Sequence, residues 1–195
     1  MAVIHVGIKD KIIAIASSTG GPEAVDTVIK GLPANTPPIL IVQHMPAILT
    51  AQFAARLDRV GQISAKEAED GDFLQRNWAL VAPGNFHMKV EKDGHRLMVR
   101  CFQSAKMHGV RPAADILFDS LAELGIKNVV GVVLTGMGAD GAAGLKKLRD
   151  MGAVTIGQDK KSSVVYGMPK AAFDAGAVDF QLPLDRIAEK IVQLI

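Results

Sequence analysis

The sequence predicts one α/β domain with a doubly wound, mostly parallel sheet that is flanked by helices on both faces. Two observations lead to this prediction. Short apolar runs, of the kind found in strands buried on both faces, alternate along the chain with segments whose apolar residues recur at helical spacing. The 195 residues suit a single domain that can bury a sizeable core.

The first part of the chain contains two units in which a strand leads through a turn into a helix. The strands are expected at residues 12–17 and 39–43, and the helices at 24–32 and 49–60. Ser18 follows the first strand, in a turn that Gly20 and Gly21 allow to be tight. His44 follows the second strand. Both residues therefore lie at the carboxyl end of a predicted strand.

The middle of the chain departs from the parallel pattern. Around residues 78–100 we expect an antiparallel hairpin excursion, because Asp93-Gly94 separates two β-like runs and such a pair is typical of a hairpin turn. The parallel pattern then returns, with helices expected at 112–124, 141–152 and 184–195 and strands at 128–135 and 153–158. Asp140 follows the most apolar of these strands in a glycine-rich turn.

Composition excludes several classes of function. A formal net charge of +2 gives no electrostatic basis for binding nucleic acid or anionic lipid. No apolar run approaches the roughly 18 residues of a membrane span, and the first residues do not resemble a secretory signal. The single cysteine, Cys101, cannot form an internal disulfide and is expected to be a packed structural thiol. We therefore expect a cytoplasmic protein that is not inserted in a membrane, with residues 1–10 as a linker or tail and 11–195 as the domain.

Ser18, His44 and Asp140 are the three residue types of a serine hydrolase. A serine hydroxyl is a weak nucleophile, so it requires an imidazole to accept its proton and a carboxylate to orient that imidazole. Carboxyl ends of strands in one parallel sheet converge, which allows the three side chains to meet. The segment around Ser18 is similar to the G-x-S-x-G elbow, although Ala16 replaces the first glycine, and Thr19 would supply an amide to an oxyanion. A helix cap or a phosphate-binding turn is the simpler alternative for Ser18.

The other four histidines lie in segments that differ in their expected exposure. His5 is expected in a tail and His95 in a hairpin, both in solvent, whereas His87 and His108 are expected in glycine-bearing loops. None of the histidine pairs has the i, i+4 spacing and carboxylate company of a zinc helix. The sequence therefore predicts no metal.

The turn around Asp140 also supports a second interpretation. Gly136, Gly138 and Gly141 spell G-x-G-x-x-G between a strand and a helix, and Asp159 follows 18 residues after Gly141. This is the pattern of a dinucleotide-binding turn. An anionic Asp140 inside a phosphate turn would repel the ligand, and this interpretation leaves Ser18 and His44 unexplained.

Five segments together resemble one known family. ASSTGGPEAV, IVQHMP, RPAADILF, VVLTGMGADGAAG and YGMPKAA are similar, in this order, to the signature blocks of the chemotaxis receptor methylesterases, the CheB-type protein-glutamate methylesterases. The likeness runs from about Lys11 to the end of the chain. It implies that Ser18 is the nucleophile, His44 the general base and acid, and Asp140 the residue that orients His44. Thr19 and the backbone at Met137 match positions that stabilise the oxyanion.

The resemblance also implies a reaction and partners. Ser18 would attack the γ-methyl ester of a glutamate in the cytoplasmic domain of a methylated chemoreceptor and release methanol, without a cofactor, and some family members also deamidate receptor glutamine. Family members usually carry a receiver domain that covers the site, and no such domain precedes Lys11. We therefore expect one of three arrangements: the receiver domain belongs to a longer protein of which this chain is a part, it acts in trans, or the chain works without one. Two alternatives remain at this point: a dinucleotide-binding domain that uses Gly136, Gly138 and Gly141, and an inactive adaptor that binds receptor helices.

Overall fold

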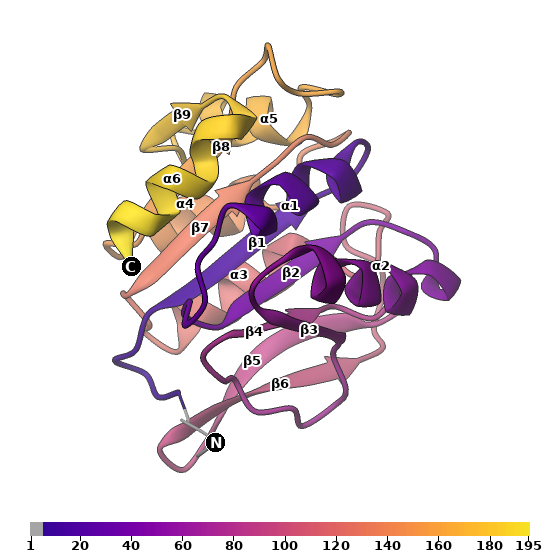
Figure 1. Ribbon diagram of the computed structural model, residues 1–195, viewed down its shortest axis with the longest axis vertical. Coiled ribbons are helices and arrows are strands. Elements are labelled where there is room, and N and C mark those ends of the chain that lie inside the picture. Colours follow the sequence, from indigo (N-terminus) through magenta and orange to yellow (C-terminus); the bar gives the residue numbers. More distant parts are fainter. Residues whose placement is uncertain (1–5) are drawn as a thin grey trace.

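A seven-stranded parallel sheet forms the centre of the computed structural model, which describes residues 6–195 (Figure 1). Its strands are β1 (Ile12–Ser17), β2 (Ile39–Gln43), β3 (Ser64–Glu67), β4 (Trp78–Val81), β7 (Val129–Val133), β8 (Val154–Gln158) and β9 (Phe180–Leu182). They lie in the order β3-β4-β2-β1-β7-β8-β9, and each neighbouring pair is parallel. The predicted fold class is confirmed. His5 lies outside the described residues.

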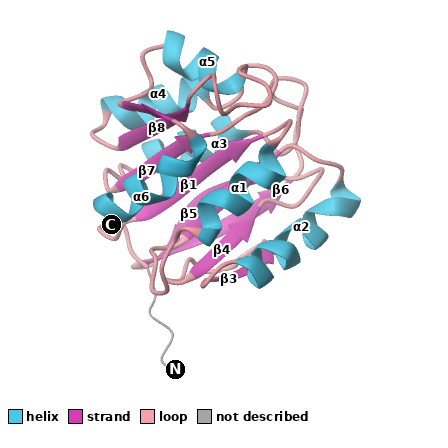
Figure 2. Cartoon of the chain, turned by 45° about the horizontal axis from the view of Figure 1, so that its top comes forward, coloured by secondary structure: helices cyan, strands magenta, loops and turns pink. Residues whose placement is uncertain are grey.

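Helices cover both faces of this sheet (Figure 2). They are α1 (Gly21–Lys30), α2 (Ala47–Val60), α3 (Ala114–Glu123), α4 (Ala142–Asp150), α5 (Met168–Asp174) and α6 (Leu184–Leu194). One buried cluster joins the sheet to α1, α2 and α6, and a second joins its other face to α3, α4 and α5. Within the described residues, none of the helices is long and apolar enough to cross a lipid bilayer.

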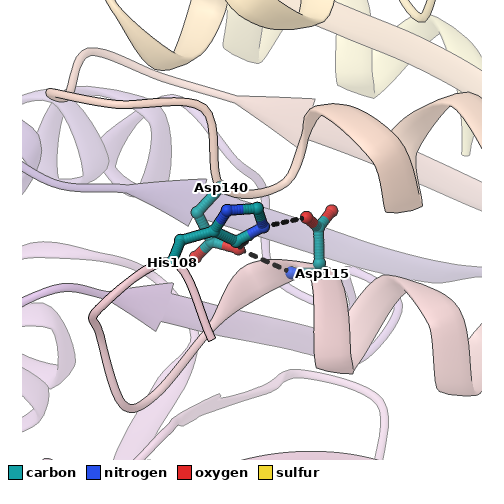
Figure 3. A group of neighbouring side chains, drawn as sticks. All are labelled: His108, Asp115 and Asp140. Atoms are coloured by element: carbon teal, nitrogen blue, oxygen red, sulfur yellow. Dashed lines mark hydrogen bonds and ion pairs between the residues drawn. The ribbon is translucent and has the colours of Figure 1, made fainter. Parts of the chain in front are cut away.

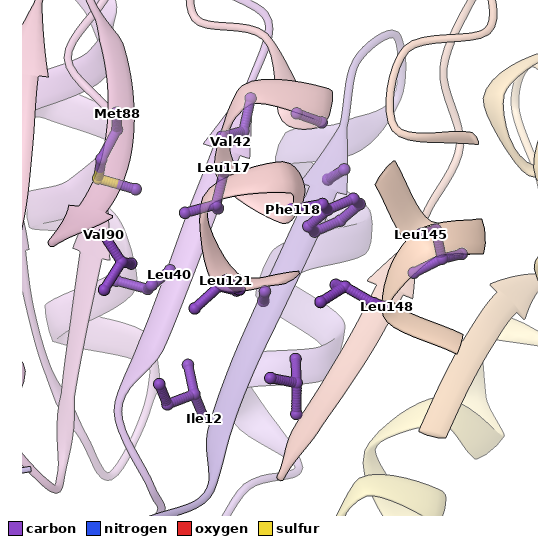
Figure 4. Packing of buried hydrophobic residues seen from close by; sticks show 14 of the residues in the cluster. Ile12, Leu40, Val42, Met88, Val90, Leu117, Phe118, Leu121, Leu145 and Leu148 are labelled. Atoms are coloured by element: carbon purple, nitrogen blue, oxygen red, sulfur yellow. The ribbon is translucent and has the colours of Figure 1, made fainter. Parts of the chain in front are cut away.

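Fully buried apolar side chains hold the second of these layers in place. Phe118 of α3 and Leu145 and Leu148 of α4 belong to the same buried cluster as Ile12 and Leu40 of the sheet (Figure 4). Burying a side chain of this size stabilises a fold by about 1.5–3 kcal/mol. Packing of this density fixes how the first turns of α3 and α4 lie over the sheet, which matters for the site described below.

The antiparallel excursion is a hairpin of β5 (His87–Asp93) and β6 (Arg96–Phe102). It lies later in the chain than expected, because Trp78–Val81 is β4, which pairs in parallel with β2 and β3 in the main sheet. His95 is exposed in the hairpin turn, as predicted. The prediction for His87 was wrong: this residue belongs to β5, not to a loop, and is fully buried.

The strand order reverses between β1 and β7, and this point is the topological switch point of the sheet. On one side of β1 lie β2, β4 and β3, which come first in the chain, and on the other side lie β7, β8 and β9. The loops after β1 and β7 therefore diverge at the carboxyl edge of the sheet. In open α/β sheets, ligands bind at such a crevice. The turns that carry Ser18 and Asp140 flank this point, and the loop that carries His44 follows the neighbouring strand β2.

Cys101 is a partly buried thiol on β6, packed against the hydrophobic core as predicted. Burial first, and then the carboxylates of Asp70, Asp72 and Glu67, raise the pKa of this thiol to about 12. Because only the thiolate is nucleophilic, we expect iodoacetamide at pH 8 to alkylate Cys101 at least about 100-fold more slowly in the native protein than in the urea-denatured protein. Mass spectrometry of timed samples measures both rates, and equal rates would contradict this description of the thiol.

Candidate active site

Ser18 lies in a tight turn between β1 and α1. Its amide N donates to the carbonyl of Thr135, and its own carbonyl accepts from the amide of Gly21 at 2.8 Å. Gly20 has a φ of 78°, which favours glycine. A Cβ on Gly21 would come within 2.0 Å of the Gln43 side chain, so only glycine fits there. The local sequence thus bends the chain sharply and leaves the half-buried Ser18 at the sheet edge.

His44 and Asp140 form the most direct contact among the predicted site residues. His44 Nε2 and Asp140 Oδ2 are 2.7 Å apart, and their side chains are 11% and 2% exposed, respectively. These residues are 96 positions apart in the sequence, and the sheet brings them together. Since Asp140 engages Nε2, the other ring nitrogen, Nδ1, is the one left to accept a proton from a neighbouring group.

Ser18 and His44 occupy equivalent places at the ends of two paired strands. They directly follow Ser17 and Gln43, which are partners in the parallel register of β1 and β2. The amide N of His44 also donates to the carbonyl of Ser17 at 3.0 Å. Among the described residues, Ser18 Oγ has no hydrogen bond to His44 or to any other residue. The structure therefore brings together His44 and Asp140, two of the three predicted catalytic residues, and places Ser18 at the end of the neighbouring strand.

The Asp140 carboxylate is buried and held by donors from two directions. Oδ2 accepts from the amide of Ala114 at 2.6 Å and contacts His44, while Oδ1 accepts from the amide of Asp115 at 3.0 Å. Burial alone would raise the pKa of Asp140, but the hydrogen bonds from His44 and the two amides outweigh it and lower that pKa below its ordinary value. Asp140 is therefore an anion that can fix the orientation of an imidazole.

Gln43 connects the two turns that carry Ser18 and His44. Its side chain is buried, and its amide Nε2 donates to the carbonyls of both residues, at 2.9 Å in each case. Its Oε1 accepts from the hydroxyl of Ser17 at 2.6 Å. Gln43 was not among the residues predicted from the sequence. Its signal is a polar side chain at the last position of an otherwise apolar strand, but its partners are visible only in the tertiary structure.

The three glycines around Asp140 have roles other than binding phosphate. A Cβ on Gly136 would lie 2.7 Å from Ser18 Cβ and 2.5 Å from Met168 Sδ, so this glycine allows the chain to pass beside Ser18. Gly138 and Gly141 have φ values of 93° and 88°, which turn the chain toward α4. The space beside Gly136 and Gly141 is thus filled by protein, whereas a Cβ on Gly138 would meet no atom within 4 Å. This packing argues against the dinucleotide-binding interpretation of these glycines.

Thr19 and Met137, the residues predicted to stabilise an oxyanion, lie in the turns on either side of the β1–β7 crevice. Thr19 is exposed, and the Met137 side chain is 71% exposed. Their backbone amides donate to no other group in residues 6–195. Two unpaired N–H groups near Ser18 are the kind of donor that stabilises negative charge on a carbonyl oxygen.

His87 and His108 lie in different environments. His87 is a structural residue, because Nδ1 accepts from the amide of Ala113 at 3.2 Å and Nε2 lies 3.1 Å from the carbonyl of Ala105. His108 lies beside the site: its Nε2 is 2.7 Å from Asp115 Oδ2 and 4.0 Å from Asp140 Oδ1 (Figure 3). Sequence spacing did not predict this cluster of one histidine and two carboxylates.

Among the described residues, His108, Asp115 and Asp140 form the one group of potential ligands whose atoms lie close enough together to hold a metal ion. All four of its carboxylate oxygens already accept a hydrogen bond. The donors are the amides of Ala114, Asp115 and Gly144 and the two imidazoles. The carboxylate oxygens are therefore already occupied by protein donors, and the contact with His44 suits the site to proton transfer.

A pocket of about 220 Å³ opens beside His44. Met45, Asn85, Val110 and Pro112 contribute to its wall, together with the cationic side chains Lys106 and Arg111. Arg111 is held by neutral acceptors, Asn85 Oδ1 and the carbonyl of Ser104. The pocket offers a substrate group access to the imidazole.

Comparisons with known proteins place nearly the whole chain in one family. Residues 13–191 match the family model described as CheB methylesterase. The chain is 50% identical over 187 residues to a protein-glutamate methylesterase/protein-glutamine glutaminase of Syntrophus aciditrophicus, covering 96% of this chain and 54% of that protein. A Pyrococcus abyssi protein of the same name is 46% identical over 184 residues, covering 94% of this chain and 50% of that protein. The chain therefore spans about half the length of the curated relatives it matches.

A solved structure is similar over its whole length. The crystal structure of the Thermotoga maritima CheB methylesterase catalytic domain superposes with a TM-score of 0.93 at 40% identity. The match covers 96% of this chain and 100% of that one. The predicted fold thus agrees with that of a solved catalytic domain.

Proposed function

The chain belongs to the CheB methylesterase family, and from that premise we propose that it hydrolyses glutamate γ-methyl esters on a protein through Ser18, His44 and Asp140. The observation that carries the proposal is the 2.7 Å contact between His44 Nε2 and a buried, anionic Asp140 at the strand ends beside Ser18. An oriented imidazole next to a serine is the arrangement required for acyl transfer.

The proposed reaction has two stages. Ser18 Oγ attacks the ester carbonyl carbon while His44 Nδ1 accepts the hydroxyl proton, and the amides of Thr19 and Met137 stabilise the oxyanion. The bond between carbon and the methoxy oxygen then breaks, and His44 returns the proton to release methanol. In the second stage water attacks the acyl-enzyme and gives a proton to His44, which transfers it to Ser18 Oγ as the glutamate leaves. Asp140 remains ionised and keeps the imidazole oriented.

A protein substrate suits the surroundings of the site. Three large apolar side chains close to it are strongly exposed: Ile48 (78%), Met137 (71%) and Val164 (71%). Exposed apolar groups of this kind around a polar centre are typical of surfaces that contact another protein. The names of the relatives specify protein glutamate and protein glutamine. We therefore propose deamidation of protein glutamine as a second activity, to be measured beside ester hydrolysis.

We propose a methylated chemoreceptor cytoplasmic domain as the substrate, and hence the cytoplasm as the location. A receiver domain, in the same polypeptide or in trans, is the regulator that the family resemblance implies. These assignments rest on membership in the family, together with the small net charge and single cysteine of the chain.

The test of the proposed function is methanol release from a methylated receptor domain, combined with labelling by a serine-directed phosphonate. We expect methanol release, and a phosphonate adduct that peptide mass spectrometry maps to Ser18 and not to the neighbouring Ser17. Receptor binding without methanol release would instead favour the inactive adaptor. Labelling at another serine, with hydrolysis intact, would refute the assignment of the nucleophile.

A change at Gln43 should lower both the turnover and the stability of the protein. Gln43→Met keeps the length of the side chain but leaves the carbonyls of Ser18 and His44 without their shared donor. We expect turnover to fall by roughly 10–100-fold, because small displacements of reacting groups have effects of this size, and stability to fall by about 1–3 kcal/mol. Ester hydrolysis and urea denaturation measure the two effects. Gln52→Met, at an exposed position on α2, is the matched control, and equal losses in both variants would contradict the role of Gln43.

A further inference from the structure

Asp115 is a buried carboxylate that the proposed reaction does not use. It lies in the first turn of α3, and its side chain is 5% exposed. Oδ1 accepts from the amide of Gly144 at 2.7 Å, in the first turn of α4, and Oδ2 contacts His108 Nε2. Burying an anion is costly unless it is fully hydrogen-bonded, so the fold has a specific use for this group.

The backbone of the same residue holds Asp140. The amides of Ala114 and Asp115 donate to the two oxygens of that carboxylate, as the first N–H groups of a helix do for an anion. Asp140 itself lies two residues before α4, separated from it by the N-cap Gly141. The Asp115 side chain therefore ties the start of α4 to the helix turn whose amides bind Asp140.

The packing around this contact leaves little freedom. A Cβ on Gly144 would lie 2.6 Å from Phe118 Cβ and 3.0 Å from Asp115 Oδ1, so α3 and α4 approach closely only because residue 144 is glycine. His108, with a φ of 53°, places its imidazole over both carboxylates (Figure 3). A non-glycine residue seldom adopts this backbone conformation unless its surroundings hold it there.

We propose that Asp115 is a positioning residue for Asp140, and that His108 supports it. Asp115 fixes the first turns of α3 and α4 against each other, so that the two amides hold the Asp140 carboxylate at the distance and angle that orient His44. Its effect on ester hydrolysis rests on the proposed function. Its effect on the Asp140 contacts does not, and can be measured separately.

The experiment compares two substitutions at residue 115 with a matched control on the same pair of helices. Asp115→Ala removes both side-chain contacts, whereas Asp115→Asn keeps an oxygen that can accept from Gly144. Asp119→Asn is the control, because Asp119 lies one turn further along α3 and pairs with Lys147 of α4 at 2.9 Å. Rates of ester hydrolysis are divided by the folded fraction, so that a loss of stability is not counted as a loss of turnover.

We expect Asp115→Ala to lower kcat by roughly 10–100-fold while KM changes less than about threefold, since the substrate does not touch Asp115. Asp115→Asn should recover much of this loss, His108→Ala should cause a smaller loss, and Asp119→Asn should stay within about twofold of the wild type. Amide hydrogen exchange followed by NMR should show faster exchange at residues 114 and 115 in Asp115→Ala only.

The two measurements decide the proposal together. Slower turnover with faster exchange of both amides supports it. Wild-type turnover per folded molecule, or unchanged amide protection, in Asp115→Ala refutes it. If the wild-type protein itself releases no methanol, the proposed function fails, and the exchange rates alone decide whether Asp115 positions Asp140.

Discussion

Ser18→Ala should abolish ester hydrolysis, with a loss of at least roughly 10⁴-fold in kcat, because no other group replaces the nucleophile. The fold should survive the change. Ser18 Oγ has no hydrogen-bond partner within residues 6–195, and the turn is maintained by backbone contacts with Thr135 and Gly21. We therefore expect stability to change by less than about 0.5 kcal/mol.

Methanol release and thermal unfolding of the same preparation measure the two effects. Ser64→Ala is the control, because Ser64 begins β3 at the amino edge of the sheet, on the side away from the site. This variant should hydrolyse ester at the wild-type rate. If Ser18→Ala retained wild-type turnover, Ser18 could not be the nucleophile and the proposed reaction would have to be abandoned.

Asp140→Asn should have the second largest effect, again roughly 10⁴-fold in kcat. An asparagine amide facing His44 Nε2 would favour the wrong tautomer of the imidazole and would not stabilise its protonated form. Substrate binding should change little, so the loss should appear in kcat more than in KM. The measurement is steady-state hydrolysis with the receptor substrate. A variant with full activity would show that His44 works without this carboxylate.

The same substitution should change how stability depends on pH. The pKa of Asp140 is lowered in the folded protein, so its charged form stabilises the fold at pH values above the ordinary value of 3.8. This stabilisation is lost as the pH falls through the still lower folded value. At pH 7 we expect the wild type to be more stable than Asp140→Asn by about 1–3 kcal/mol, and the difference should shrink below about pH 4. Urea denaturation across this range measures it, and a difference independent of pH would be the contrary result.

The sequence predicted most of the central strands and helices because their signals are local. β1, β2 and β7 are continuous apolar runs, and α6 has apolar residues at helical spacing. The short edge strands β3 and β9 have weak apolar signals and were not predicted individually. β4 was assigned to the hairpin, because a four-residue apolar run does not itself reveal which strands it will join.

Predictions about the site divide in the same way. Ser18, His44 and Asp140 could be selected because each is a polar residue of suitable chemistry just after an apolar strand. The supporting roles of Gln43 and Asp115 could not, since a buried polar side chain is defined by its partners. Those partners are distant in sequence, for example Gly144, which lies 29 residues after Asp115.

By itself, the sequence determined the central strands β1, β2, β7 and β8, most of the helices, and the three polar residues that follow β1, β2 and β7. Periodicity, apolar runs and turn residues act over a few positions, so they can be recognised without coordinates. Only the tertiary structure decided that β1 lies between β2 and β7, that His44 contacts Asp140 across 96 positions, and which amides hold that carboxylate. These contacts depend on the parallel packing of distant segments, which local preferences do not specify.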